Sequence, residues 1–269
     1  MRLNFHSIAF WLLVSLLIGF VLLPAVVTAI VAFNAGAVIT FPPKDWSLRW
    51  FERALTYRDF QRGLWNSVIV MLWTSVFAVS IGGAFAWVID RCDFPGKRLL
   101  EGLLTSSLLI PSFTIGIGFL ILANQVAMNR SFAVVIVTHV ILVLPFVMRA
   151  VFVSLRSIDP SLERAAASLG AGPWAVLRTI TLPLMVPGLF SGLLFAAILS
   201  FNEFTATLFV SAQATQTLPV AMYNYVREYA DPSMAALSVM FFVMITVVLA
   251  LTNWLMDLGR ILAIKSQDH

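Results

Sequence analysis

Long apolar stretches alternate with short polar segments along this chain. Six stretches exceed the roughly 18 residues that mark a membrane-crossing helix: Ile8–Ala32, Leu64–Ile89, Leu103–Ala123, Phe132–Phe152, Leu184–Phe209 and Ala235–Met256. A backbone inside lipid must satisfy its own hydrogen bonds, so we expect each stretch to be a helix. The polar segments, at most about thirty residues long, are too short for separate domains with their own cores. The pattern therefore predicts an all-α polytopic membrane protein with six transmembrane helices, in which residues 1–269 form a single transmembrane domain.

Composition agrees with a membrane protein, since 60% of the residues are hydrophobic and 11% are charged, against about 25% charged in soluble domains. The first apolar stretch is longer than the roughly 7–15 residues of a signal peptide core, so we expect a true span. Cys92 is the single cysteine, which excludes an internal disulfide and a thiolate metal site. The histidines are too scattered to indicate a metal site. We expect His139, inside the fourth stretch, to be a hydrogen-bonded packing residue.

The chain carries a net charge of +4. In a membrane protein this balance is typical of loop Lys and Arg residues that face anionic lipid, not of nucleic-acid binding. Six spans would put both termini on one side. With the termini inside, the inside segments hold nine Lys and Arg residues and the outside segments seven. This is a weak preference, and the first outside loop, with five of the seven, opposes it.

Two outside loops carry helix signals. In Phe41–Trp65, Asp45 follows two prolines as a candidate N-cap. The apolar residues on one side of the expected helix are Trp46, Trp50, Phe51 and Leu55. We expect this helix to lie at the membrane surface; the alternative is a solvated loop with anchoring tryptophans. In the last outside loop, Thr217 and Pro219 predict a short helix that ends before Asp231.

Prolines 24, 111 and 145 interrupt three apolar stretches and predict kinks. Glu203 lies in the fifth stretch, about 10 Å beyond its middle toward the outer face. A carboxylate at that depth is costly unless it is paired, protonated or facing water, and it indicates function by default. With neighbouring amide and aromatic groups it would suit a cation. The candidate substrate-pathway residues are Phe201, Asn202, Glu203, Phe204 and Thr205. The alternative is a structural Glu, hydrogen-bonded to Asn202 or to a Ser or Thr of another helix.

The segment Glu163–Pro183 is the longest run that cannot lie inside a membrane. Asp159 and Pro160 predict a helix start before it, with Asp as N-cap and Pro at the first helical position. The expected helix, Ser161–Leu169, ends at Gly170, because Gly permits a left-handed C-cap. A second helix restarts at Pro173. Two short helices with an elbow between them would form an exposed, protruding segment that could bind in a recess of another protein.

This segment resembles the cytoplasmic loop of bacterial ABC-importer permeases, whose pattern is Glu-Ala-Ala, three residues, Gly, nine residues, Ile-x-Leu-Pro. The matching residues are Ala165, Ala166, Gly170, Ile180, Leu182 and Pro183. One departure is that Arg164 occupies the position of the family's Glu, while Glu163 lies one residue earlier. If the family's Glu makes a particular ion pair, this chain must make that pair from the shifted position of Glu163 or lack it.

The resemblance runs from about Leu64 to Met256. The segments Ser200–Phe204 and Thr217–Pro219 are similar to spermidine/putrescine-type permeases, a branch that resembles permeases for iron, thiamine and aminoalkylphosphonates as well. The resemblance implies a type I ABC importer transmembrane domain with residues 64–256 as its core, preceded by residues 1–63 as a first span plus outer loop. It makes residues 159–183 a cytoplasmic coupling loop, so that both termini would be cytoplasmic.

In such an importer the expected partners are a second permease subunit (commonly a different chain), two ATPase subunits, an extracytoplasmic substrate-binding protein and the lipid of the bacterial inner membrane. The expected ATPase-coupling residues are Glu163, Arg164, Ala165, Ala166, Gly170, Ala171 and Trp174. This chain is not expected to be an enzyme, because Gly96-Lys97-Arg98 lacks the earlier Gly and the hydroxyl residue of a phosphate loop. ATP and Mg would be bound by the partner ATPases, and this chain would bind no cofactor.

The substrate expected from the resemblance and from Glu203 is a polyamine or another small organic cation. The alternative within the same class is another small solute. A secondary transporter or channel is a second hypothesis, but the sequence has no repeated half and no matched pair of interrupted helices. An intramembrane enzyme is a third, and it lacks support because the spans hold no Ser-His arrangement, paired carboxylates or metal cluster.

Overall fold

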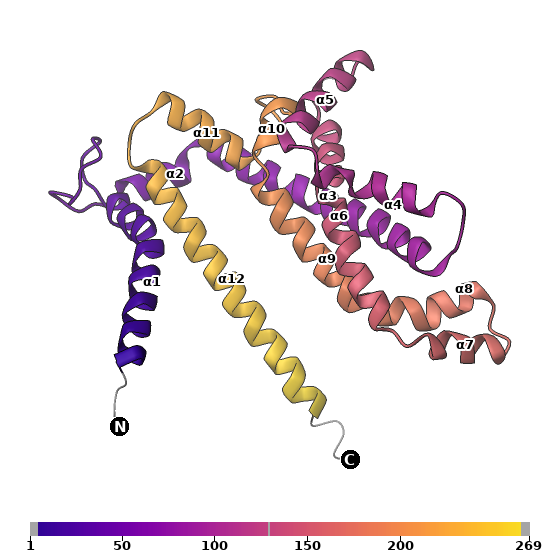
Figure 1. Ribbon diagram of the computed structural model, residues 1–269. Coiled ribbons are helices and arrows are strands. Elements are labelled where there is room, and N and C mark those ends of the chain that lie inside the picture. Colours follow the sequence, from indigo (N-terminus) through magenta and orange to yellow (C-terminus); the bar gives the residue numbers. More distant parts are fainter. Residues whose placement is uncertain (1–4, 129, 265–269) are drawn as a thin grey trace. The chain divides into compact units, whose positions relative to one another are not determined.

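The computed structural model describes residues 5–128 and 130–264 (Figure 1). Its α-helices, in chain order, are α1 (Phe5–Ala32), α2 (Arg49–Thr56), α3 (Arg58–Arg91), α4 (Lys97–Thr105), α5 (Ser112–Gln125), α6 (Phe132–Ser157), α7 (Pro160–Ser168), α8 (Pro173–Val176), α9 (Leu182–Asn202), α10 (Thr205–Val210), α11 (Leu218–Glu228) and α12 (Ser233–Ile264). A 3₁₀ turn, Ser106–Leu108, follows α4, and a π-helical turn, Leu177–Thr181, joins α8 to α9. The chain divides into a terminal unit, residues 1–60 with 224–269, and a central unit, residues 61–223.

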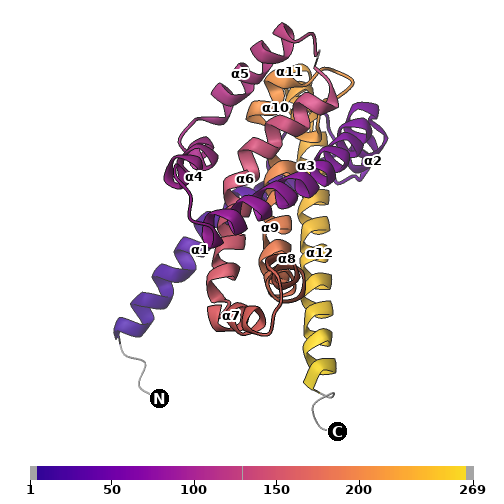
Figure 2. The ribbon, with the colours of Figure 1, turned by 90° about the vertical axis from the view of Figure 1, so that its right-hand side faces the viewer.

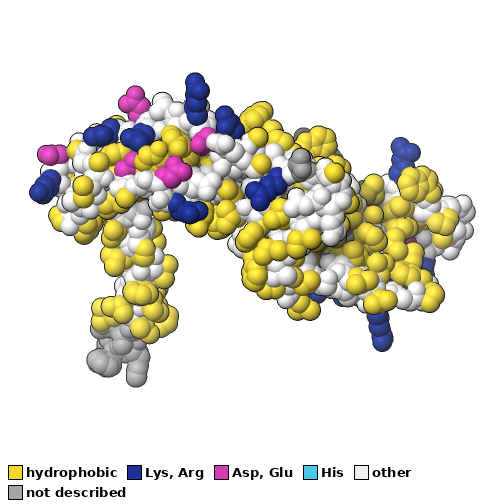
Figure 3. Space-filling model, turned by 90° about the horizontal axis from the view of Figure 1, so that it is seen from above, with side chains coloured by type: hydrophobic (Ala, Val, Ile, Leu, Met, Phe, Trp, Pro, Cys, Tyr) yellow, Lys and Arg dark blue, Asp and Glu magenta, His cyan; other side chains and the backbone are white. Residues whose placement is uncertain are grey.

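In the terminal unit, α12 contacts both α1 and α2. Trp50 of α2 is 1% exposed and packs with Ala32 and Ala236. Its indole nitrogen donates a hydrogen bond of 2.6 Å to the carbonyl of Asn34. These contacts anchor α2 to the protein through one aromatic side chain. Viewed from above, Lys, Arg, Asp and Glu side chains gather over the segment around α2 (Figure 3).

The structure corrects two details of the expected surface helix. The residue that precedes α2 is Leu48, with no side-chain hydrogen bond to the helix, so Asp45 is not its N-cap. Trp50 is buried against protein, whereas Trp46 and Leu55 are exposed, so these residues do not form one exposed aromatic side. Sequence periodicity placed the residues on a common side, but the tertiary contacts of Trp50 decide its burial. The short helix expected after Thr217 is confirmed as α11.

The core of the central unit lies where α6 and α9 pack side by side. Its fully buried residues include Val147, Val151 and Leu155 of α6. Glycines of α9 allow the close approach: a Cβ at Gly188 would collide with Ser154, and one at Gly192 would lie 3.1 Å from Val147. Small residues at a helix crossing let backbones approach in this way, which is typical of membrane bundles.

Among the described residues, four helices are long and apolar enough to cross a membrane: Phe10–Ala32, Arg58–Arg91, Phe132–Ser157 and Pro173–Asn202. A fifth crossing is present if the bent pair Lys97–Leu108 and Ser112–Gln125 forms one span. The sixth predicted span, Ala235–Met256, lies on α12. The apolar part of α12 whose side chains are described without a gap, Ser233–Val247, is shorter than a span, and the side chains of residues 248, 249 and 251–256 lie outside those described. The sixth crossing therefore stays a prediction.

Two predicted spans are not single helices. The stretch Leu103–Ala123 is divided at Pro111, where the two helices meet at a bend of 104°. The stretch Leu184–Phe209 ends as a helix at Asn202 and resumes with the short α10. The kink expected at Pro111 is thus a complete break. By contrast, α1 and α6 continue as helices through Pro24 and Pro145. In α6, where Pro145 is buried, neighbouring helices can support a turn that lacks one backbone hydrogen bond.

Candidate functional site

The α7–α8 hairpin, residues 160–176, lies at the end of α6 and the start of α9 in both ribbon views (Figure 2). Asp159 is the N-cap of α7, and its carboxylate accepts a 2.8 Å hydrogen bond from the backbone nitrogen of Ser161. The hydrogen bonds from Ser161 hold the pKa of the Asp159 carboxyl below its usual value. Pro160 occupies the first helical position. The predicted start of the loop helix is confirmed.

The elbow after α7 is a Schellman motif. The backbone nitrogen of Ala171 donates to the carbonyl of Ala166, and that of Gly170 donates to the carbonyl of Ala167. Gly170 has a φ of 88°, which side chains with a Cβ rarely adopt. The predicted glycine cap is therefore confirmed, and it reverses the chain between α7 and α8.

The second arm of the hairpin is not a separate helix. From Pro173 the chain is helical without a break to Asn202, a run of 30 residues. The π-helical turn in this run precedes Pro183, which cannot donate a backbone hydrogen bond to Thr179, so the wider turn relieves the conflict. The second of the two expected short helices is therefore the first part of a continuous helix that includes α9.

Three apolar side chains of the hairpin are exposed. Leu169, at the C-cap of α7, is 89% exposed, Trp174 is 72% exposed, and Leu162 is also exposed. Because the sequence places this segment outside the membrane, lipid would not cover these side chains, and they are candidates for contact with another protein. Leu169 was missed in the sequence analysis, although an apolar residue directly before a cap glycine in an alanine-rich helix was a usable signal.

The remaining predicted coupling residues divide between two environments. Glu163, Arg164 and Ala171 line a groove of about 440 Å³ that α3, α7, α8 and the π-helical turn form. The Glu163 carboxylate lies 3.1 Å from the guanidinium Nε of Arg91. Ala165 is exposed, and Ala166 contributes its carbonyl to the helix cap. Glu163 is therefore engaged within the chain, whereas Arg164 is exposed.

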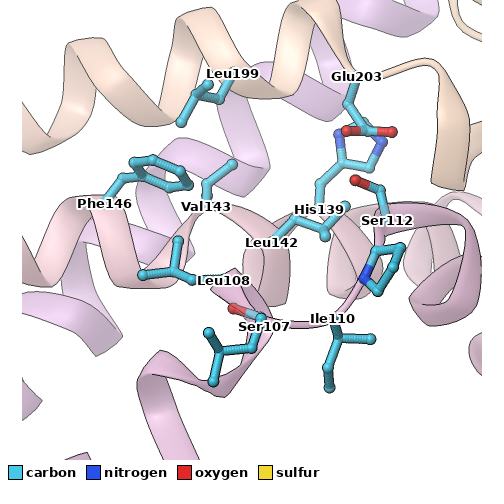
Figure 4. A pocket seen from close by; sticks show the side chains of 12 residues that line it. Ser107, Leu108, Ile110, Ser112, His139, Leu142, Val143, Phe146, Leu199 and Glu203 are labelled. Atoms are coloured by element: carbon cyan, nitrogen blue, oxygen red, sulfur yellow. The ribbon is translucent and has the colours of Figure 1, made fainter.

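A second feature is a hollow of about 480 Å³ in the central unit (Figure 4). One wall is the broken segment between α4 and α5, from Ser107 to Ser112, and α6 and the end of α9 form the others. Figure 4 shows Glu203, His139 and Ser112 close together on one side, opposite the apolar Phe146. The hydroxyl of Ser107 is buried with no hydrogen-bond partner among the described residues.

Glu203 is not inside a continuous span, contrary to the sequence expectation. It follows the last residue of α9, and its carboxylate caps α10 by accepting a 2.8 Å hydrogen bond from the backbone nitrogen of Ala206. Its carbonyl accepts from the Thr207 hydroxyl at 3.0 Å. The carboxylate has a structural role at the break between the two helices, and it also lines the hollow.

The other four predicted pathway residues do not line this hollow. Asn202 donates its side-chain amide to the carbonyl of Ile198, within its own helix. Phe204 packs against Tyr223 with ring centroids 5.1 Å apart. Thr205 is exposed, and Phe201 is partly buried. Because the helix ends at residue 202 and the chain bends at Glu203, the side chains on either side of Glu203 do not point into the hollow with it.

His139 is a hydrogen-bonded packing residue, as predicted. It is fully buried, with Nδ1 at 2.9 Å from the Ser200 hydroxyl and Nε2 at 2.7 Å from the Thr207 hydroxyl. These contacts join α6 to α9 and α10. His139 also belongs to the lining of the hollow, and so do Ser107 and Ser112, which the sequence analysis missed because only the break at Pro111 brings them there.

The chain matches known transport proteins over most of its length. A model of the family described as binding-protein-dependent transport system inner membrane component matches residues 92–257. The molybdenum transport system permease protein ModB of Escherichia coli (strain K12) is 32% identical over 217 residues, covering 73% of this chain and 95% of ModB. The putrescine transport system permease protein PotI of the same strain is 30% identical over 237 residues, covering 85% of this chain and 84% of PotI.

The fold has a solved counterpart. A chain from the crystal structure of a bacterial ABC transporter involved in the import of the acidic polysaccharide alginate aligns with a TM-score of 0.73. The sequence identity is 17%, and the alignment covers 94% of this chain and 97% of that one, so the likeness concerns the fold. The family match covers more than half of the chain and agrees with the exposed hairpin. The chain therefore belongs to the binding-protein-dependent inner-membrane transport components and is a type I ABC importer permease of the bacterial inner membrane.

Proposed function

We propose that this chain forms one half of the translocation pathway of an ATP-driven importer. A second permease subunit of different sequence supplies the other half, two ATPase subunits dock on the α7–α8 hairpin, and an extracytoplasmic binding protein delivers the substrate. In this arrangement the hairpin is cytoplasmic, six spans put both termini on the same side, and ATP and Mg are bound by the ATPases. The exposed Leu169 and Trp174 carry the proposal.

The hairpin has the properties of a docking element. Its helix is capped at both ends, so little conformational entropy remains to be lost when a partner binds. A large aromatic side chain that enters a partner's pocket is a typical hot spot, contributing about 2 kcal/mol or more. The continuous helix from Pro173 to Asn202 then connects the docked hairpin to the wall of the hollow.

Copurification tests the docking. The tagged permease, solubilised with its partners, should bring down ATP-hydrolysing subunits, and Trp174→Ala should reduce their recovery about tenfold or more because a hot-spot side chain is lost. Trp46→Ala is the matched control, since Trp46 is exposed to a similar extent in the terminal unit. Undiminished recovery with Trp174→Ala, or equal losses in both variants, would contradict docking through this residue.

For the substrate we propose a small organic cation such as a polyamine. Glu203 supplies a carboxylate to the hollow, and no Lys or Arg side chain lines it among the residues that the structure describes. A carboxylate attracts a cation more strongly in a site of low effective dielectric than in bulk water. The same hollow supports a second candidate, an oxyanion, because ModB is named for molybdenum transport and the lining offers the hydroxyls of Ser107 and Ser112. Iron, thiamine or aminoalkylphosphonate import are further alternatives within the class.

Uptake measurements separate the two candidates. Cells that depend on this importer are given labelled spermidine or labelled molybdate, with wild-type chain, Glu203→Gln, and Glu101→Gln as an exposed carboxylate control. For a cation, Glu203→Gln should lower spermidine uptake about tenfold at unchanged complex yield, since one charge interaction is lost in a desolvated site. Molybdate uptake that Glu203→Gln leaves intact would favour the oxyanion. A fall in complex yield would instead identify Glu203 as solely the cap of α10.

A further inference from the structure

Arg91 is the last residue of α3, and all three nitrogen atoms of its guanidinium make contacts near the base of the hairpin. Its Nε lies 3.1 Å from Oε2 of Glu163 in α7. Nη1 donates to the carboxylate of Asp90 at 2.8 Å, and Nη2 donates to the backbone carbonyl of Leu155 in α6 at 3.3 Å. The planar fork of Arg suits several simultaneous acceptors. One side chain thus joins the ends of α3 and α6 to the first turn of α7.

Glu163 extends these contacts to a fourth element. Its Oε1 accepts a 2.8 Å hydrogen bond from the hydroxyl of Thr181, which closes the π-helical turn and is 1% exposed. The same carboxylate therefore ties α7 to α3 on one side and to the start of α9 on the other. We refer to Arg91, Glu163 and Thr181 as the loop clamp.

The clamp is better shielded than an ordinary surface ion pair. The side chains of Arg91 and Glu163 are 20% and 18% exposed, whereas Asp93 in the nearby Lys97–Asp93 pair is fully exposed. Exposed ion pairs contribute little to stability because water screens them, whereas hydrogen bonds to shielded charged groups contribute more. The clamp is thus strong enough to hold a short helix in place.

Helix α7 has little else to hold it. All nine of its residues are described, and none of them is buried. Its apolar side chains Leu162 and Leu169 are exposed, so hydrophobic packing does not fix the helix against the bundle. Without Glu163, α7 would be held mainly by its chain connections to α6 and α8.

We propose that the loop clamp positions α7 rigidly on α3 and on the start of α9, so that displacement of the docked hairpin moves both helices together. Glu163 is then a positioning residue inside the permease and not a contact to the ATPase. This inference rests on the proposed function for the source of the displacement. If the loop clamp couples α7 to α3 and α9, then breaking the clamp must let α7 move independently of these helices, and such independent motion can be measured.

Amide exchange of the full chain in lipid nanodiscs tests the rigidity. Glu163→Gln and Arg91→Gln should each speed backbone exchange in residues 160–169 about tenfold, the equivalent of about 1.4 kcal/mol. The double variant should exchange no faster than the faster single one, because either substitution already breaks the Arg91–Glu163 ion pair. Asp93→Asn, which breaks an exposed pair of equal length, is the control and should leave exchange unchanged. Unchanged exchange in both single variants, or additive effects in the double variant, would overturn the clamp.

A distance measurement tests its mechanical role. Spin labels at Ser168 of α7 and Ser80 of α3, both exposed, are read in the assembled importer with and without MgATP. With the clamp intact the distance should not depend on nucleotide, and Glu163→Gln should make it shift or broaden. A nucleotide-independent distance in Glu163→Gln would contradict the proposal. If the wild-type chain assembles with no ATPase, the proposed function fails, while the exchange result still reports on the clamp.

Discussion

At the scale of single residues, the two glycines of the hairpin, Gly170 and Gly172, differ in their backbone conformation. Gly170 needs its positive φ of 88°, whereas Gly172 has an ordinary φ of −69°. A Cβ at either position would meet no atom within 4 Å in this chain. A difference between substitutions at these sites would therefore reflect backbone strain at Gly170 or a partner surface that approaches the elbow.

We predict that Gly170→Ala destabilises the hairpin by about 1 kcal/mol, because the left-handed conformation is unfavourable for a residue with a Cβ. ATP-driven uptake should fall severalfold while the complex stays assembled, and Gly170→Asp should lower it further. Gly172→Ala should transport normally. The readout is uptake normalised to the amount of complex. Equal activity of Gly170→Ala and Gly172→Ala would show that the shape of the elbow does not matter.

At the scale of elements, the hairpin was predictable because its boundaries are set locally. Asp159 and Pro160 start α7, Gly170 ends it and Pro173 starts the next helix, and each signal acts within one turn. The same holds for α11. Helix propensity and capping need no knowledge of distant contacts, so the sequence alone was enough for these elements.

The elements that could not be predicted depend on contacts between distant residues. The hydropathy pattern predicts one apolar span from Leu184 to Phe209. In the structure the carboxylate of Glu203 caps a new helix, α10, and the span is divided there. The clamp joins residues 91 and 163, and Trp50 is buried by residues on other helices. For the hollow, the sequence indicated Glu203 and a kink at Pro111. It did not indicate that the helix breaks there and brings Ser107 and Ser112 to the same site.

At the scale of the whole molecule, the hairpin that we propose as the ATPase-binding element is connected to a wall of the hollow that we propose as the substrate site. The continuous helix Pro173–Asn202 links the two within the central unit, and the clamp ties α3 to its start. A packed bundle moves between discrete arrangements, so a displacement at one end of a rigid helix is expected at the other. The central claim is that the exposed face of the hairpin is the surface on which the ATPase acts.

Site-specific photo-cross-linking tests that claim most directly. A photoreactive residue replaces Leu169 in the hairpin or, as a control, Leu55 in α2, which is also an exposed leucine. In membranes containing the whole importer, the Leu169 position should capture an ATPase subunit in high yield, and the Leu55 position should not. Capture of no ATPase at Leu169, or equal capture at both positions, would contradict the account.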